Sequence, residues 1–189
     1  RVGVFSIMKV IDAMHKHDLN VDEVDKLTGP VIGRTKSATF RTTDLVGLDT
    51  MIKVSGNLYQ ALPKDESREY FKLPEVLLQM EKNKWLGDKT GQGFYKKVKG
   101  PKGESEILTL DLKTLEYKEK GKAKFATLET TKTIDNLRER FKVLLAGKDK
   151  AGAFYRDSFY SLFQYASNRI PEIADELYKI DDAICAGFG

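Results

Sequence analysis

Few residues of this chain are of the types that perform acid–base or nucleophilic chemistry. Its 189 residues include two histidines, His15 and His17, and one cysteine, Cys185. On a regular helix, side chains two residues apart point about 200° apart, so the histidines would not share a metal ion. Nothing beside Cys185 would activate a thiolate, and we expect it to be a buried structural thiol. We therefore expect no catalytic residue and no metal site within this chain.

Two glycine-containing stretches have some features of nucleotide-binding loops. Gly29–Thr35 has three residues between its glycines where the phosphate loop needs four, and arginine where that loop has lysine. The second stretch, Gly87–Gly93, is followed by Phe94-Tyr95 and an expected strand, whereas a dinucleotide fingerprint opens a helix directly after a strand. We expect this second stretch to be a turn between a helix and a hairpin, with a positive φ at Gly91 or Gly93.

The composition is that of a folded chain in a reducing compartment. With 41% hydrophobic and 32% charged residues, the chain can bury a core and keep a charged surface. It has no run of about 18 apolar residues that could span a membrane. Lys9 and Asp12 interrupt the first apolar run, so we expect that this run is not a signal peptide. A single cysteine precludes internal disulfides, and we expect a cytoplasmic protein.

The net charge of +4 is unevenly distributed, because lysine and arginine are in excess between Lys89 and Lys150. Such a basic region could face a phosphorylated ligand or a nucleic acid. It could equally be a solvated surface, which is the commoner case. The sequence leaves both possibilities open.

The first part of the chain predicts a series of helices. An apolar pattern with helical spacing opens the chain without a capping residue or an initiator methionine, so we expect that helix to begin upstream. Asn20–Glu23 predicts a capping box for a second helix that ends before Gly29. After a polar loop over 31–41, Thr43 or Asp44 is expected to cap a third helix that Pro63 ends, and short helices follow over 65–71 and 74–85. The inward residues are expected to be Val4, Ile7, Met8, Ile11 and Met14 in the first helix, and Leu45, Leu48, Ile52 and Leu58 in the third.

The hydrophobic period then changes from helical to alternating. We expect three short strands over 93–98, 106–110 and 115–118 to form an antiparallel meander, with a turn at Gly100–Gly103. Helical patterns return after Thr131, and Phe159, Leu162 and Leu177 are expected to be largely buried. The apolar stripes of this last part are Ile134, Leu137, Phe141 and Leu144; then Tyr155, Phe159, Leu162, Phe163 and Ala166; then Ile173, Leu177, Ile180 and Ile184.

Two of these segments together resemble a known family. Thr43–Thr50 reads TDLVGLDT and Leu86–Tyr95 reads LGDKTGQGFY. This pair is similar to the paired motifs in the C-terminal helical domain of the L-3-hydroxyacyl-CoA dehydrogenases, and Val24–Leu27 resembles that family's second helix. Residues 36–41 depart from the family's GPFEL-like stretch and keep only the aromatic Phe40, so the resemblance does not fix the shape of the wall that faces the acyl chain.

The resemblance implies a mainly α fold like the C-terminal domain of 6-phosphogluconate dehydrogenase, with a small β-meander insert. It divides the chain into a helical domain over 1–95, a basic connector over 96–130 and the start of a second helical copy over 131–189. The second copy rests on a weak internal repeat: Ile180–Ala183 resembles Val24–Leu27, and the same offset lays Phe159–Leu162 over Gly3–Ser6. We expect this copy to be truncated and to dock on the first unit.

The resemblance also implies an oxidoreductase that passes a hydride from C3 of an (S)-3-hydroxyacyl-CoA to NAD in fatty-acid β-oxidation. The family's His–Glu pair and its NAD site belong to an N-terminal Rossmann domain, so this chain alone would be inactive and would bind no cofactor. Implied partners are the acyl-CoA substrate, the Rossmann domain and a second copy in a homodimer or pseudo-dimer, with neither membrane nor nucleic acid. The implied substrate-binding residues are Arg1, Ser37, Thr39 and Phe40.

One alternative of a different class remains open. The chain could be a freestanding helical interaction module whose basic patch binds nucleic acid or an acidic partner. A freestanding module should cap its own first helix, and no capping residue precedes Val4.

Overall fold

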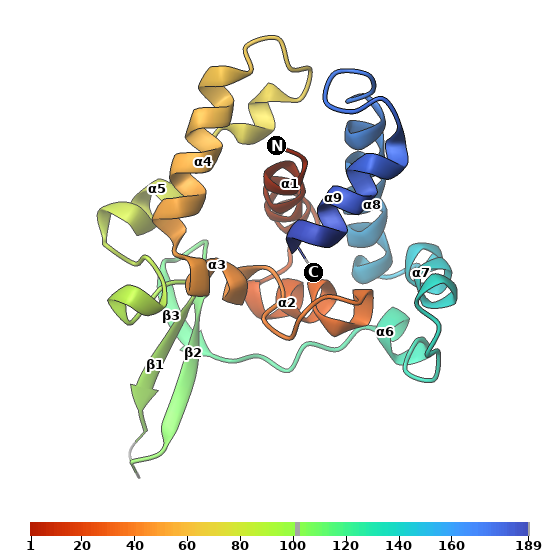
Figure 1. Ribbon diagram of the computed structural model, residues 1–189. Helices are drawn as coiled ribbons and strands as arrows, with labels where there is room; N and C mark the ends of the chain where they lie inside the picture. The colour runs from red at the N-terminus through yellow and green to blue at the C-terminus, as the bar shows by residue number, and fades with distance from the viewer. Residues whose placement is uncertain (101–102, 189) are drawn as a thin grey trace.

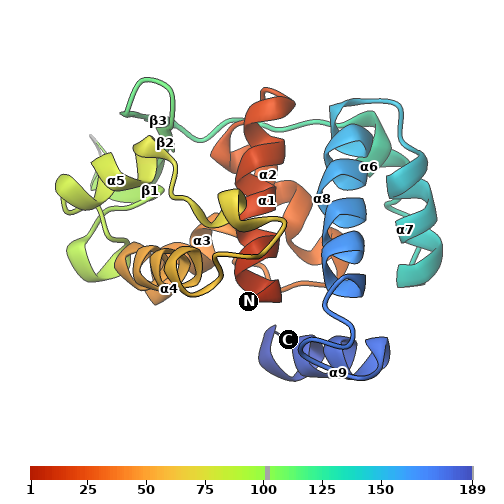
Figure 2. The same ribbon diagram turned by 90° about the horizontal axis from the view of Figure 1, so that it is seen from above.

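The central element of the fold is helix α1 (Val2–Lys16), around which the other helices are arranged (Figure 1). The computed structural model describes residues 1–100 and 103–188. Figure 2 shows α1 beside α8 (Lys150–Ser167), with α4 (Leu48–Ala61) on its other side. This position explains the wide apolar surface of α1, because a helix flanked on several sides must bury residues on more than one face. The helix predicted at the start of the chain is confirmed.

The second helix, α2 (Val21–Thr28), begins with the predicted capping box. The Asn20 side chain accepts from the Glu23 backbone N–H at 2.9 Å, and the Glu23 carboxylate accepts from the Asn20 N–H at 2.9 Å. A 3₁₀ turn, η1 (Pro30–Ile32), follows and ends at Gly33, which has a φ of 82°.

The predicted third helix is in fact two helices. Helix α3 (Phe40–Val46) ends at Gly47, whose φ of 102° separates it from α4. Neither Thr43 nor Asp44 caps a helix, because both lie inside α3. Leu45 is 55% exposed instead of inward, since the break at Gly47 interrupts the helical period that would align it with Leu48 and Ile52. Leu48 and Ile52 are buried as predicted, and Leu58 is partly buried.

Short elements lead from α4 to the sheet. The expected helix over 65–71 is a 3₁₀ turn, η2 (Arg68–Phe71), and the next is α5 (Glu75–Lys82). A further 3₁₀ turn, η3 (Asp88–Thr90), precedes the first strand.

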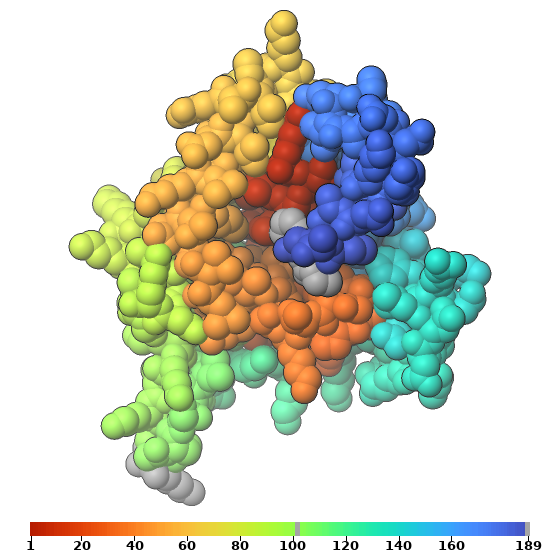
Figure 3. Space-filling view, in the orientation of Figure 1, coloured from red at the N-terminus to blue at the C-terminus, as the bar shows by residue number. Residues whose placement is uncertain are grey.

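The predicted antiparallel meander is confirmed. Strands β1 (Tyr95–Lys99), β2 (Ser105–Asp111) and β3 (Glu116–Glu119) form a sheet in the order β1-β2-β3, with both pairs antiparallel. The outer part of the β1–β2 hairpin projects from the body (Figures 1 and 3). Its inner part is anchored, because Leu110 is buried in the main core. Within the predicted turn at 100–103, Pro101 and Lys102 lie outside the described residues.

The last part of the chain forms α6 (Ala126–Thr130), α7 (Leu137–Ala146), α8 and α9 (Leu177–Phe188). Helix α8 runs antiparallel to α1, so that Tyr165 stacks on Phe5 at 3.9 Å while Asp157 meets His17 near the other end. Helix α9 crosses the N-terminal end of α1 (Figure 2), where Ile180 packs with Val2 and Phe5.

Three burial predictions for this last part are wrong. Phe163, in the predicted apolar stripe of α8, is 52% exposed. Leu177 is 45% exposed, because it begins α9 and lies a turn away from the contact that Ile180 makes with α1. Cys185 is exposed on α9 and is therefore not a buried thiol. Phe159 and Leu162, on α8, are partly buried.

Candidate functional site

The loop that carries Ser37, Thr39 and Phe40 is held by one carboxylate, that of Asp25 on α2. Its Oδ1 accepts from the backbone N–H groups of Thr39 at 3.1 Å and Phe40 at 2.7 Å, and its Oδ2 accepts from that of Arg41 at 3.0 Å. These N–H groups open α3 and have no partner within the helix. Asp25 therefore caps α3 from another helix, which explains why α3 has no cap from its own side chains.

Asp25 also ties this loop to the sheet, because the Tyr95 hydroxyl donates to its Oδ2 at 2.8 Å. Burial raises the pKa of Asp25, and the hydrogen bonds from Phe40, Tyr95, Arg41 and Thr39 offset only part of that effect. Sequence patterns missed this residue, since its partners are at least fourteen positions along the chain.

Three of the predicted substrate-binding residues lie together in this loop, but they differ in how far each is buried. Thr39 is buried and donates from its Oγ1 to that of Thr28 at 2.8 Å. Phe40 is buried against the ring of Phe94, with the centroids 4.6 Å apart. Ser37 is partly exposed. Of these three residues, Ser37 is the one that is not buried, and its Oγ lies 2.8 Å from the Oγ1 atoms of both Thr35 and Thr42.

The two family-like motifs are joined by a second buried carboxylate, that of Asp44. Its Oδ1 accepts from the Phe94 N–H and its Oδ2 from the Tyr95 N–H, both at 2.9 Å. Burial raises the pKa of Asp44 to about 6, although both hydrogen bonds act in the opposite direction. The motif of residues 43–50 thus fixes the start of β1, which is part of the other motif.

This contact requires glycine at two positions. A Cβ on Gly93 would lie 2.1 Å from the Asp44 Oδ1, and one on Gly87 would lie 2.2 Å from the Asp44 carbonyl oxygen. Only residues without a Cβ allow backbone to approach this closely. Gly91 has a φ of 76°, which confirms the predicted turn geometry. The stretch is therefore a structural turn.

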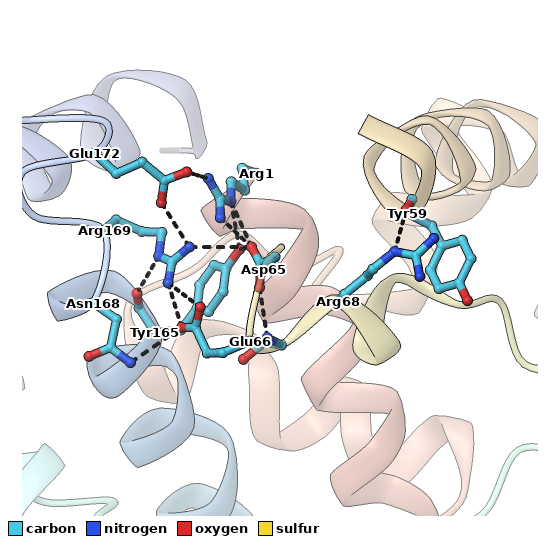
Figure 4. Close-up of polar contacts among 10 residues, drawn as sticks. Arg1, Tyr59, Asp65, Glu66, Arg68, Tyr165, Asn168, Arg169 and Glu172 are labelled. Carbon is cyan, nitrogen blue, oxygen red and sulfur yellow. Dashed lines mark hydrogen bonds and ion pairs between the residues drawn. The ribbon is translucent and has the colours of Figure 1, made fainter. Parts of the chain in front are cut away.

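Arg1 lies apart from this loop, in an ionic cluster that links α1, the residues before η2 and the end of α8 (Figure 4). Its guanidinium Nε donates to Asp65 Oδ2 at 3.0 Å and to the Tyr165 hydroxyl at 2.8 Å, and its Nη1 donates to Glu172. The Tyr165 hydroxyl donates to the same Asp65 oxygen at 2.7 Å. Arg169 joins the cluster by donating to Asp65 and Glu172.

In this cluster the pKa values of Arg1 and Asp65 are both shifted in the direction that favours the charged form. Burial acts to lower the pKa of the Arg1 guanidinium, but hydrogen bonds with Glu172, Asp65 and Tyr165 raise it overall. Burial acts to raise the pKa of Asp65, but hydrogen bonds from Tyr165, Arg1 and the Ser67 N–H lower it overall. Both groups stay charged at neutral pH, so neither suits the role of general acid or base.

The histidines lie near the other end of α1. His17 Nε2 is 2.5 Å from Asp157 Oδ2, and Lys16 Nζ is 2.9 Å from the same oxygen. Among residues 1–100 and 103–188, no group of three or more His, Cys, Asp and Glu is placed to hold a metal ion. Over the same residues, no helix is both long enough and apolar enough to cross a membrane.

Comparison with known proteins identifies relatives of the chain. The family model for the 3-hydroxyacyl-CoA dehydrogenase C-terminal domain matches residues 1–97. A probable 3-hydroxyacyl-CoA dehydrogenase of Bacillus subtilis is 40% identical over 189 residues, which is 100% of this chain and 23% of the relative. A protein of the same description from Deinococcus radiodurans is 44% identical over 109 residues, covering 58% of this chain and 31% of the relative.

A more distant relative is a putative fatty acid oxidation complex trifunctional enzyme of Rickettsia prowazekii. It is 25% identical over 190 residues, covering 100% of this chain and 25% of the relative. No solved structure gives a significant match. The chain thus spans about a quarter to a third of the length of these relatives. The family match over 1–97 includes both motifs that Asp44 joins, and the chain belongs to the 3-hydroxyacyl-CoA dehydrogenase family as its C-terminal domain.

Proposed function

We propose that this chain is the helical portion of an NAD-dependent (S)-3-hydroxyacyl-CoA dehydrogenase that acts in cytoplasmic fatty-acid β-oxidation. The observation that carries the proposal is the family match over 1–97, a region whose motifs the structure joins through Asp44. The names of the Bacillus and Rickettsia relatives support the substrate class and the pathway, respectively.

In this proposal the loop over 34–41 forms one wall of the substrate cleft. Ser37, which is partly exposed, contacts the substrate, while Thr39 and Phe40 set the shape of the wall from beneath because both are buried. Asp25 fixes that shape by holding three consecutive N–H groups of the loop. Arg1 lies apart from this wall and contributes indirectly, because its cluster fixes the direction of the chain at the start of α1.

NAD is assigned to a Rossmann domain outside this chain, because no G-x-G-x-x-G occurs in the present sequence. The nicotinamide, when bound there, accepts the hydride from C3 of the substrate. The general base that removes the hydroxyl proton is assigned to the same domain, which makes the present chain inactive alone. The residues of this chain orient the substrate and exclude water. The antiparallel pairing of α8 with α1 supports the further proposal that 131–189 begins a second copy in a pseudo-dimer.

A chimera tests this function. The present chain would replace the aligned segment of the Bacillus subtilis relative, to which it is 40% identical over its whole length. We expect the chimera to reduce NAD when given a 3-hydroxyacyl-CoA, and the isolated chain to give no NADH above the blank. A folded but inactive chimera would contradict the proposed function. Turnover by the isolated chain would contradict the assignment of the catalytic groups to another domain.

A further inference from the structure

A basic groove lies between α2, the sheet and the irregular segment over 120–124 that leads from β3 toward α6. In Figure 1 this segment crosses beside α2 on its way to α6. The groove has a volume of about 1190 Å³, and its lining includes eight lysines and arginines against four aspartates and glutamates. Small-molecule sites commonly have volumes of roughly 300–1,000 Å³, so the groove has room for a nucleotide.

The four acidic residues of the basic groove already have partners within the protein. Asp22 accepts from the Thr109 hydroxyl at 2.8 Å and from the Gly121 N–H at 3.1 Å. Asp25 is occupied by the start of α3 and by Tyr95. Asp88 pairs with Arg41, and Glu129 pairs with Lys132. These carboxylates therefore contribute little attraction for a further cation.

In the part of the chain that the structure describes, Lys26 donates to a backbone carbonyl oxygen and forms no ion pair, and five further lysines of the basic groove also remain without a carboxylate partner. Within residues 1–100 and 103–188, none of them forms an ion pair; they are Lys36, Lys97, Lys120, Lys122 and Lys124. Like charges gathered in a concave surface produce a positive potential that concentrates anions.

The lysines of the segment over 120–124 are brought to the groove by contacts of the residues between them. The Gly121 N–H donates to Asp22, and the Ala123 carbonyl oxygen accepts from Lys26 at 2.5 Å. Both partners lie on α2. The backbone of the segment is thus fixed against α2, while the side chains of Lys120, Lys122 and Lys124 line the groove.

The sheet contributes both an apolar surface and a charge. Ile107 lines the groove and is 52% exposed, and it is paired across the strands with Lys97. Residues directly opposite in an antiparallel pair share one face of the sheet. A flat base can therefore lie on Ile107 while a phosphate contacts Lys97.

We propose that the basic groove binds the nucleotide end of coenzyme A, with its 3′-phosphate and diphosphate on these lysines and its adenine on Ile107. The inference rests on the proposed function, which makes a CoA thioester the substrate. Lys36 and Arg41 line the groove and also belong to the loop that forms the proposed substrate wall, so one ligand can reach both the groove and the wall. The concave shape favours such a compact ligand over a bilayer or a duplex.

Calorimetry with adenosine 3′,5′-bisphosphate tests the site on the chain itself. The variant is Lys122→Gln with Lys124→Gln, and the control is Lys53→Gln with Lys82→Gln, which changes the charge equally at exposed positions outside the groove. We expect binding to weaken at least tenfold in the groove variant and less than twofold in the control. No detectable binding, or equal effects in the two variants, would overturn the proposal. So would tighter binding of single-stranded DNA through the same lysines.

Kinetics in the chimera separate this inference from the proposed function. The groove variant should raise KM for a 3-hydroxyacyl-CoA about tenfold and leave KM unchanged for the N-acetylcysteamine thioester of the same acid, which lacks the nucleotide. An equal rise for both thioesters would overturn the nucleotide site while leaving the dehydrogenase intact. An inactive chimera that still binds the bisphosphate through the lysines would count against the function and not against the site.

Discussion

Two buried aspartates connect segments that are far apart in the sequence. Asp25 and Asp44 each accept hydrogen bonds from consecutive backbone N–H groups, at the start of α3 and at the start of β1. A buried carboxylate is unfavourable unless hydrogen bonds compensate it. The raised pKa of Asp44 shows that this compensation is incomplete. At the residue scale, the scaffold of the proposed substrate wall therefore depends on protonation.

Asp44→Asn should remove one pH-dependent part of the stability. Asp44 has a pKa of about 6 in the folded chain against an ordinary value of 3.8, so the folded state binds more protons between these pH values. The stability of the wild type relative to the variant should therefore fall as pH rises from about 4 to about 7, by up to ~3 kcal/mol. Urea unfolding of both proteins across this range measures the difference.

Asp49→Asn is the matched control, because hydrogen bonding to Lys89 lowers the pKa of Asp49. That carboxylate stabilises the fold above its ordinary pKa and loses this contribution as pH falls. The stability of the wild type relative to Asp49→Asn should therefore rise with pH, opposite to the trend for Asp44→Asn, and only at the acidic end of the range. If the difference in unfolding free energy between the wild type and Asp44→Asn did not change between pH 4 and pH 7, the raised pKa of Asp44 would be contradicted.

At the scale of elements, the turn before β1 combines two separate requirements for glycine. Gly93→Ala would force a methyl group against the Asp44 carboxylate, whereas a Cβ on Gly91 has no heavy atom within 4 Å. Gly91→Ala should cost only the strain of its positive φ, about 1–2 kcal/mol. Gly93→Ala should also lose the hydrogen bonds to Asp44 and cost about 3 kcal/mol or more. Urea unfolding at neutral pH measures the loss of unfolding free energy in each variant. Equal losses for Gly91→Ala and Gly93→Ala would contradict the clash between a Cβ on residue 93 and the Asp44 carboxylate.

The sequence predicts elements whose signals are local. The capping box at Asn20 and the meander after Gly93 were identified because each depends on neighbouring residues. The start of α3 is not predictable in this way, because its cap, Asp25, lies on another helix. The sequence predicts one helix through Gly47, because a single glycine can be tolerated within a helix and the φ of 102° depends on the surroundings of Gly47.

The candidate site also depends on contacts between residues that are far apart in the sequence, and these contacts could not be predicted. Ser37, Thr39 and Phe40 were predicted through the family resemblance, and their proximity follows from the sequence. Their burial could not be predicted, because it depends on Thr28 and Phe94, which belong to other elements. The position of Arg1 depends likewise on α8, whose Tyr165 is more than 160 residues away.

At the scale of the whole molecule, the ionic cluster at Asp65 joins the first and last parts of the chain. Asp65 is fully buried and accepts from Arg1, Tyr165 and Arg169, so it contacts both the start of α1 and the end of α8. The stacked rings of Phe5 and Tyr165 lie beside it and add apolar contact to the same junction. This junction fixes α8 and, through it, the position of α9.

Asp65→Ala should loosen this junction. The change leaves the buried Arg169 and the half-buried Arg1 without their shared carboxylate, and removing one partner of a buried ion pair costs about 3–5 kcal/mol. Hydrogen exchange should accelerate more in α8 and α9 than in α5, because the attachment of α8 and α9 to α1 weakens while α5 lies outside the junction.

The control is Arg68→Ala, since Arg68 donates to the Tyr59 carbonyl oxygen at 2.8 Å and lies over the Tyr59 ring without contacting α8 (Figure 4). Arg68→Ala should leave exchange in α8 and α9 unchanged. Uniform acceleration across all helices in Asp65→Ala would mean that the cluster stabilises the whole fold and does not specifically hold its last part.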